Sequence, residues 1–384
     1  MQRRSAPLGA LFISAALAAC SSSPPASDDA RLRASIQQIM EQQQREGFSG
    51  VVLATHGDEV LLHAAYGLAD RKTQAPMTKD TVIDAGSLSK QVTATAAVLL
   101  ESQGKLSLED PLSKFFEAVP ADKRNITVKQ LLTHTAGIHS WVLPDDFTPI
   151  PREAWLEKVF STPLQHPPGQ TFLYSNDGYT LVAMVIEKVT GRPYRDYLKQ
   201  TFFTPLGMTR SGWYDDAIFR EPSVSVATGY RNEKDDGAPN EWPGPYWPLL
   251  GNGGILWTTT DLLKWHQAIH GELLPKAARE KLFTPAIHVD RHTGYEGEHR
   301  GAGYALGWSI GRTFCGDVRI GHRGAGVTHN VDYRYYPERD LLVYVASNKL
   351  DANSSGEELF YSKRATNAIA HVILENCNQP AKGR

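Results

Sequence analysis

The pattern of apolar and polar positions divides the chain into two ends with regular periodicity and a middle with little. Over residues 28–48 the apolar side chains fall at helical spacing and the stretch closes at Gly47, which predicts an amphipathic opening helix. Segment 49–67 then holds two apolar runs separated by a glycine-containing turn at 56–58, a pattern typical of a β-hairpin. We therefore expect a helix followed by two antiparallel strands.

Alternation returns near the C-terminus. Segments 318–324, 328–336 and 340–348 alternate as strands do, and a final helix is predicted from about Glu357 to Leu374. We expect these strands to pair with the two N-terminal ones.

The middle of the chain alternates little and is rich in Pro, Gly and Trp. Its helical segments are 127–132, 152–160, 178–190 and 259–270. Strands at both ends around a helical insertion predict an α/β (α+β) fold with two lobes. One lobe is an antiparallel sheet flanked by helices (about 29–105 and 301–376), and the other is mostly helical (about 106–300). A site is expected in the cleft between them.

The first residues have the layout of a bacterial secretory signal. Arg3 and Arg4 precede an apolar run that stops at Cys20, and this run is too short for a permanent membrane span. Residues 17–20 look like a lipobox, the alternative being an ordinary cleavage site with an incidental cysteine. We expect a signal peptide over 1–19, lipidation of Cys20, a flexible tether over 20–28 and a catalytic domain over 29–378.

This layout predicts a periplasm-facing lipoprotein of the bacterial cell envelope, held on a membrane by its lipid. Ser21, which follows the cysteine, favours the outer membrane over the inner one. In an oxidising compartment Cys315 and Cys377 can form a disulfide, although two buried free thiols remain the alternative.

The charge pattern limits the kind of partner. The formal net charge is -2, and acidic and basic residues are evenly spread, so no field favours nucleic acid. We expect a small-molecule or peptide substrate, and the sequence leaves the oligomeric state open.

A candidate nucleophile lies where a buried helix is predicted to begin. In Ser87-Leu88-Ser89-Lys90 the serine and the lysine share one helical face, and a lysine with a lowered pKa accepts a serine proton. Ser102 and Lys105 have the same spacing, but they fall at the end of that helix, where the dipole has the wrong sign. We therefore take the second match as chance.

Two further segments offer groups for an acyl-transfer site. Tyr174-Ser175-Asn176 supplies a phenol for proton transfer, for which a phenolate near the lysine would serve, and an amide that can hold the substrate. The similar stretch 230–232 adjoins charged residues and is predicted to be a solvated loop. Segment 321–325, Gly-His-Arg-Gly-Ala, ends a predicted strand where a substrate backbone can approach.

Together Ser87-x-x-Lys90, Tyr174-x-Asn176 and His322-x-Gly324 resemble the three signature motifs of the class C β-lactamase and penicillin-binding superfamily. Segment 131–138 is also similar to the family's L-L-x-H-x-S-G, with alanine in place of serine. The resemblance covers about 30–350 and implies a β-lactamase/transpeptidase-like fold.

The resemblance also implies a role for each residue. Ser87 would be the acylated nucleophile, Lys90 its proton acceptor or electrostatic partner, and Tyr174 the activator of Ser87 or of the deacylating water. Asn176 would hold the substrate amide, and the backbone N–H groups of Ser87 and Ala325 would form an oxyanion hole. No cofactor is implied.

His322 departs from the β-lactamase pattern. Dedicated β-lactamases of this type usually carry lysine there, whereas histidine titrates near neutrality and is common among the family's esterases and D-peptidases. Arg323 is a substitute cation only if it points into the cleft. We therefore expect a serine hydrolase of amides or esters, such as D-amino-acid peptides. The alternatives are a true class C-like β-lactamase and a non-catalytic, penicillin-binding-like envelope lipoprotein.

Two groups of residues have a second interpretation. His134 and His139 suggest a metal site, but they lack partners at ligand spacing, so we expect a structural role for His134 and no metal. The aromatic stretch 242–247 and Trp141 are either a cleft wall or an inert cover.

Overall fold

The computed structural model describes residues 28–289, 300–313, 315–353 and 355–375. The predicted signal peptide, the lipidation site Cys20 and the tether up to residue 27 lie outside the described residues, as does Cys377. Cys315 is disulfide-bonded. Its pairing with Cys377 stays a prediction.

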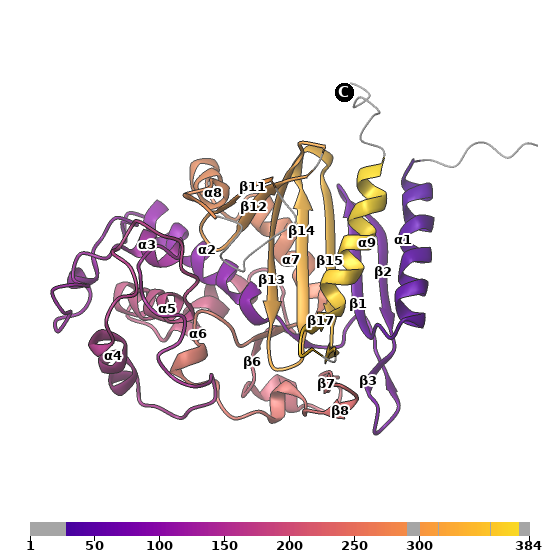
Figure 1. Ribbon diagram of the computed structural model, residues 1–384, viewed down its shortest axis with the longest axis horizontal. Coiled ribbons are helices and arrows are strands. Elements are labelled where there is room, and N and C mark those ends of the chain that lie inside the picture. The colour runs from indigo at the N-terminus through magenta and orange to yellow at the C-terminus, as the bar shows by residue number, and fades with distance from the viewer. Residues whose placement is uncertain (1–27, 290–299, 314, 354, 376–384) are drawn as a thin grey trace, which may run out of the picture.

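An eight-stranded antiparallel sheet forms the centre of the molecule (Figure 1), with the strand order β10-β11-β12-β13-β14-β15-β1-β2. In chain order the strands are β1 (Gly50–His56), β2 (Glu59–Tyr66), β10 (Ile287–His288), β11 (Arg300–Tyr304), β12 (Ser309–Arg312), β13 (Val318–Ala325), β14 (Asn330–Tyr336) and β15 (Leu341–Ser347).

The predicted pairing between the two chain ends is confirmed. Strand β1 lies between β2 and β15, and Gly50 stands opposite Ser347 in the register. The hairpin between β1 and β2 turns at Gly57, whose φ of 56° suits glycine and whose N–H donates to the carbonyl of Asp340.

Helices cover both faces of this sheet or form the lobe beside it. They are α1 (Asp28–Arg45), α2 (Ser89–Ser102), α3 (Val128–Leu132), α4 (Arg152–Ser161), α5 (Asn176–Thr190), α6 (Tyr194–Leu198), α7 (Thr259–His270), α8 (Lys276–Phe283) and α9 (Tyr361–Glu375). Figure 1 shows α1 and α9 side by side at one end, and α3 to α6 gathered at the other.

Alternation along the strands sends side chains into two cores. Val52 and Val343 pack with Ile36 of α1 and Ile369 of α9 on one face. The residues between them, such as Leu53, face the other way into the larger core that holds α2, α5 and α7. Helix α2 is buried almost throughout because it is built from alanine, valine, threonine and leucine. This burial fixes the start of α2 beside the sheet.

Short strands depart from the sequence predictions. Strands β10 to β12 extend the sheet, and of these only β10 lies well inside the segment expected to belong to the helical lobe. The final helix begins at Tyr361 rather than Glu357, because Glu358–Phe360 forms strand β17 against β16 (Leu350–Ala352). Strands β5 (Ile83–Asp84), β9 (Ile255–Trp257) and β6 (Gly212–Trp213) form a small sheet just before the start of α2.

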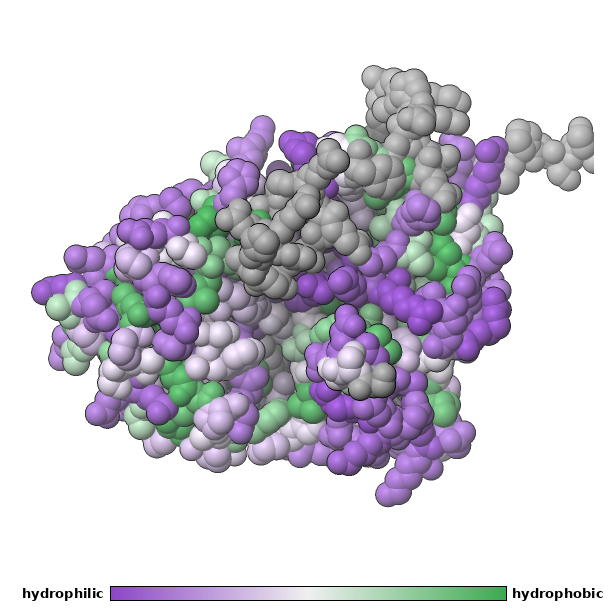
Figure 2. All heavy atoms as spheres, viewed as in Figure 1, coloured by the Kyte–Doolittle hydropathy of each residue, from purple (hydrophilic) through white to green (hydrophobic). Residues whose placement is uncertain are grey.

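The surface shows no broad apolar area on the side in view. Figure 2 shows hydrophilic side chains over most of this face, with hydrophobic ones in small separate groups. Among the described residues, no helix combines the length and apolar character that crossing a bilayer requires.

Candidate active site

Ser87 sits in a tight turn that feeds helix α2. The turn is the 3-10 segment η1 (Gly86–Leu88), and Ser87 is partly exposed although its neighbours on both sides are buried. Gly86 has a φ of 50°, and a Cβ there would lie 2.6 Å from the backbone nitrogen of Ala325. Only glycine permits this turn to lie against the end of β13.

Lys90 reaches Ser87 from one turn further along. Its Nζ lies 3.0 Å from Ser87 Oγ, 2.6 Å from Asn176 Oδ1 and 2.9 Å from the carbonyl oxygen of Asn252. The side chain is wholly buried, and this desolvation lowers the pKa of Lys90 well below its ordinary value, against a smaller opposite effect of Asp146. The predicted serine–lysine pair is thus present.

The three partners of Lys90 show how a neutral amine fits here. The two carbonyl oxygens, from Asn176 and Asn252, only accept, so each holds one N–H. The third partner, the Ser87 hydroxyl, either donates or accepts. A neutral Lys90 keeps both carbonyl bonds and turns its lone pair toward Ser87, as proton removal requires.

Tyr174 also contacts Ser87. Its ring centroid lies 4.3 Å from that of His134, and Lys90 Nζ lies 4.8 Å from the Tyr174 ring centroid. Burial raises the pKa of the Tyr174 phenol above its ordinary value, although its hydrogen bond with Ser87 and the charge of Arg323 act in the opposite direction. The phenol is therefore protonated at neutral pH, and the expected phenolate is not the resting form.

Asn176 is held in place at the start of α5. Ser175 is the N-cap: its Oγ accepts from the N–H of Gly178 at 2.9 Å and donates to the carbonyl of His139 at 2.7 Å. The Ser175 N–H donates to His134 Nδ1 at 3.0 Å. These bonds fix the helix end that carries Asn176 against Lys90.

His322 lies on strand β13 in a hydrogen-bond chain with Tyr304 and His134. The Nε2 atoms of His134 and His322 lie 3.2 Å and 3.0 Å from the Tyr304 hydroxyl, and His322 Nδ1 lies 2.5 Å from the carbonyl oxygen of Arg323. Because His134 Nδ1 accepts from a backbone N–H and His322 Nδ1 faces a carbonyl, the protons are assigned. His134 Nε2–H donates to Tyr304, and the Tyr304 hydroxyl donates to His322.

The sequence led us to expect that His322 titrates near neutrality, but in the structure it does not. Desolvation by burial is the main cause, and it lowers the pKa of His322 to about 3. Arg323 does not replace the missing cation. It stands opposite Asp332 in the register, on the other face of the strand from His322, which stands opposite Tyr333.

Carboxylates lie close to this site. Asp177 follows Asn176 and accepts from the N–H of Val142 at 2.7 Å, and burial raises its pKa to about 7. Asp146 accepts from Trp141 Nε1 at 3.1 Å and interacts electrostatically with both Asp177 and Lys90. Burial also raises the pKa of Asp146. The site therefore combines neutral His322 with acidic groups.

The second serine–lysine match at Ser102 and Lys105 and the tyrosine-containing stretch 230–232 are not part of this site. Ser102 ends helix α2, and its Oγ donates to the carbonyl of Leu99 at 2.8 Å. Tyr230 lies in a short hairpin rather than the predicted solvated loop. It is buried, and its hydroxyl accepts from the N–H of Arg71 at 2.7 Å.

The structure bears on the two residue groups that had a second interpretation, the histidines and the tryptophans. Both ring nitrogens of His134 are hydrogen-bonded within the protein, as expected of a structural histidine, and no group of three or more His, Cys, Asp or Glu in the described chain is placed to hold a metal. Trp242 packs against Phe147 and Tyr214, whereas Trp141 is 49% exposed. Trp242 is therefore mainly a cover.

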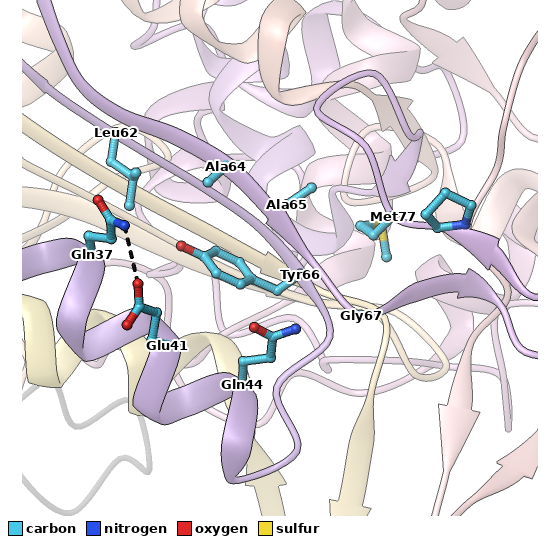
Figure 3. A pocket seen from close by; sticks show the side chains of 10 residues that line it. Gln37, Glu41, Gln44, Leu62, Ala64, Ala65, Tyr66, Gly67 and Met77 are labelled. Carbon is cyan, nitrogen blue, oxygen red and sulfur yellow. Dashed lines mark hydrogen bonds between the residues drawn. The ribbon is translucent and has the colours of Figure 1, made fainter.

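A separate groove lies far from this chemistry. It runs between α1 and edge strand β2, encloses about 610 Å³ and is partly lined by Gln37, Glu41 and Tyr66 (Figure 3). Within it, Gln37 donates to Glu41 at 3.1 Å. It holds none of the predicted site residues.

The sequence predictions missed three parts of the site. The carbonyl of Asn252 is a backbone group and has no sequence signature. Tyr304 belongs to none of the three motifs, and only the fold places it between the two buried histidines that it links. Asp84, just upstream of the nucleophile, carries no motif.

Comparisons with known proteins agree with this geometry. The family model described as Beta-lactamase matches residues 32–368. Penicillin-binding protein 4* of Bacillus subtilis (strain 168) is 25% identical over 86% of this chain and 73% of its own length. D-aminopeptidase of Brucella anthropi is 29% identical over 76% of this chain and 58% of its own length.

A solved structure shows the same fold. The octameric penicillin-binding protein homologue from Pyrococcus abyssi superimposes with a TM-score of 0.73 at 27% identity, covering 92% of this chain and 79% of that one. The antiparallel sheet built from both chain ends, with a helical lobe beside it, is thus the β-lactamase/transpeptidase-like fold that the motifs implied.

Proposed function

This chain belongs to the Beta-lactamase family, and from that membership we propose that it forms an acyl-enzyme at Ser87 and then releases the acyl group to water. It is a serine hydrolase of amides or esters. The contact between buried Lys90 Nζ and Ser87 Oγ, at 3.0 Å, carries the proposal. Ser87, which is partly exposed, therefore lies next to the Lys90 amine, whose pKa is lowered.

The acylation step follows from the protonation states. Neutral Lys90 takes the proton of Ser87 while Oγ bonds to the substrate carbonyl carbon. As the bond to the leaving group breaks, the Tyr174 phenol gives that group its proton, and the Lys90 ammonium then restores the phenol. In deacylation a water takes the place of Ser87: Lys90 removes its proton, its oxygen bonds to the acyl carbon, and Ser87 Oγ leaves with a proton.

The surrounding residues bind and polarise the substrate. The N–H groups of Ser87 and Ala325 form the oxyanion hole, a donor of this kind contributing about 3 kcal/mol to transition-state stability. Asn176 holds the substrate amide. Neutral His322 and Gly324 form the opposite wall, and strand β13 offers its backbone to the substrate.

We extend the proposal to the substrate, an amide or ester of a D-amino acid with a free amino group. His322 supplies no positive charge for a substrate carboxylate, while Asp146 and, above its pKa of about 7, Asp177 supply negative charge for an ammonium. The D configuration rests on the printed activity of the relative D-aminopeptidase. The same reasoning disfavours β-lactams, which carry a carboxylate.

Labelling tests the nucleophile. We expect a fluorescent phosphonate to label the native protein and the Ser102→Ala control equally, and Ser87→Ala not at all. Tyr174→Phe should be labelled more slowly. Absence of labelling by both the phosphonate and a fluorescent penicillin would favour a non-catalytic binding protein.

Hydrolysis tests the substrate. D-alanine p-nitroanilide should be cleaved faster than its N-acetyl derivative, p-nitrophenyl esters should also be cleaved, and nitrocefin should be slow. Asp146→Asn should reduce the preference for the free amine about fivefold, since even a partly screened charge pair contributes about 1 kcal/mol. The neighbouring Asp145→Asn is the control. Fastest turnover of nitrocefin would instead identify a class C-like β-lactamase.

The location is a second proposal, supported by the sequence alone. We propose a lipoprotein anchored through Cys20 in the envelope, with Ser21 favouring the outer membrane. Labelled palmitate should enter the native protein and not Cys20→Ser, and the native protein should fractionate with outer membranes. Incorporation into Cys20→Ser would overturn the anchor.

A further inference from the structure

Asp84 is a buried carboxylate that the proposed chemistry does not use. It ends strand β5, three residues before Ser87, and is 1% exposed. Its Oδ1 accepts from the N–H of Gly86 at 2.9 Å, and its Oδ2 accepts from the Tyr214 hydroxyl at 3.2 Å. Its own N–H donates to His329 Nδ1 at 3.0 Å. The side chain is thus fixed on both oxygens.

The same carboxylate touches the segment that carries the second proposed oxyanion donor. A Cβ on Gly326 would lie 2.1 Å from Asp84 Oδ2, so the chain just beyond Ala325 rests on this oxygen. A Cβ on Gly324 would lie 2.1 Å from the carbonyl oxygen of Ala85. The end of β13 and the turn of Ser87 therefore meet around one carboxylate.

We propose that Asp84 is a positioning residue that sets the spacing between the backbone N–H groups of Ser87 and Ala325. It does not touch the substrate. Oδ1 holds the left-handed turn at Gly86, which directs the next N–H, and Oδ2 supports the chain that follows the other donor. The inference rests on the proposed function, because it assigns these two N–H groups to the oxyanion hole.

The ionised form suits this role. Both partners of the side chain are donors, and an ionised carboxylate only accepts. Burial raises the pKa of Asp84 to about 6, so it is ionised at neutral pH and loses its charge in acid. The titratable groups that face it are His329, Tyr214, Asp146 and Tyr344. Burial lowers the pKa of His329 to about 4, so this histidine is neutral.

If Asp84 only stabilised the fold, its replacement would lower the free energy of unfolding. Because the folded protein raises the pKa of Asp84, the ionised group opposes folding above its unfolded pKa. Asn has nearly the same shape, keeps an acceptor for the Gly86 N–H and removes the buried charge. Asp84→Asn should therefore be at least as stable as the native protein at pH 8, while its oxyanion hole is less well aligned.

The experiment compares Asp84→Asn with the native protein on a p-nitrophenyl ester. At pH 8 we expect kcat to fall about 10- to 100-fold, a fraction of the effect of losing an oxyanion donor, with KM within threefold. The inhibition constant of a boronic acid, whose oxygen mimics the oxyanion, should rise in parallel. Because native Asp84 loses its charge in acid, the ratio of native to variant kcat should shrink between pH 8 and pH 5.

Control variants keep the outcome decisive. Asp261 is another buried carboxylate that accepts a backbone N–H, from Arg210 at 2.8 Å, and Asp261→Asn should lose stability but keep its kcat. Tyr214→Phe removes one hydrogen bond to Asp84 and should also lower kcat. This variant replaces Asp84→Asn in the test if Asp84→Asn does not fold. An unchanged kcat, a rise in KM alone, or a ratio independent of pH would overturn the proposal. If the native protein is not labelled at Ser87, the proposed function fails first and this inference fails with it.

Discussion

The hydrogen-bond chain from His134 through Tyr304 to His322 leads to a sharp stability prediction. Tyr304 is wholly buried, and its hydroxyl accepts from one histidine and donates to the other. In Tyr304→Phe both Nε2 atoms lose this partner. Each hydrogen bond lost by a buried polar atom costs about 1–3 kcal/mol, so for the two bonds we expect the free energy of unfolding to fall by about 2–6 kcal/mol.

A second buried tyrosine provides the matched control. The Tyr194 hydroxyl lies 2.7 Å from Thr93 Oγ1, and that threonine also donates to the carbonyl of Gly251 at 2.6 Å. Tyr194→Phe therefore removes one hydroxyl of the same kind but leaves no donor without an acceptor. Its expected cost is about 1 kcal/mol.

The assay is urea unfolding at pH 8, followed by tryptophan fluorescence, with the midpoint compared at an unchanged m-value. At this pH both histidines are neutral in the folded and unfolded states, so no protonation step contributes. Equal losses for Tyr304→Phe and Tyr194→Phe would refute the assigned donors and acceptors. The hydrolysis of a p-nitrophenyl ester, measured on folded Tyr304→Phe, should also slow, because His322 loses a group that orients it.

Three further predictions concern the cap, the wall and the acid limit of the fold. Ser175→Ala should lower the free energy of unfolding by about 1–3 kcal/mol in urea titrations, because it removes the α5 cap and leaves a buried carbonyl unpaired; a loss below about 0.5 kcal/mol would contradict this. Gly324→Ala should slow phosphonate labelling more than tenfold, since the added Cβ would lie 2.1 Å from the carbonyl oxygen of Ala85, and native labelling rates would disprove the close approach. Burial lowers the pKa of His266 to about 4, so the unfolded state binds its proton first and stability falls as the pH drops from about 6.5 toward 4, by about 1.4 kcal/mol per pH unit for this group; His266→Gln should show a shallower fall, and an equal slope would argue against a buried neutral histidine.

The parts of the fold that could be predicted are those where periodicity is long enough to detect. Strands β13, β14 and β15 alternate over seven or eight residues, β1 and β2 are apolar runs of the same length around a glycine turn, and the helices around them keep a helical spacing. Strands β5 and β6 have two residues each. Two residues carry no periodicity, and their pairing depends on partners distant in the chain.

In the candidate site, the motif residues could be predicted from the sequence but their protonation states could not. Ser87, Lys90 and Asn176 are brought within hydrogen-bond distance, as their spacing in the motifs led us to expect. The protonation states were not predictable, because they depend on burial. His322 was expected to titrate near neutrality and Tyr174 to act as a phenolate, and desolvation in the folded protein reverses both.

The pairing of β1 with β15 has a consequence for how the protein is made. The ribosome synthesises Ser87 early, but Ala325 and the strand that flanks β1 come much later, since β15 begins at Leu341. Until then the first hairpin lacks its neighbour, and the two halves of the proposed oxyanion hole are not joined. We therefore expect a chain that stops before β13 to lack hydrolase activity, because the second proposed oxyanion donor, Ala325, is missing.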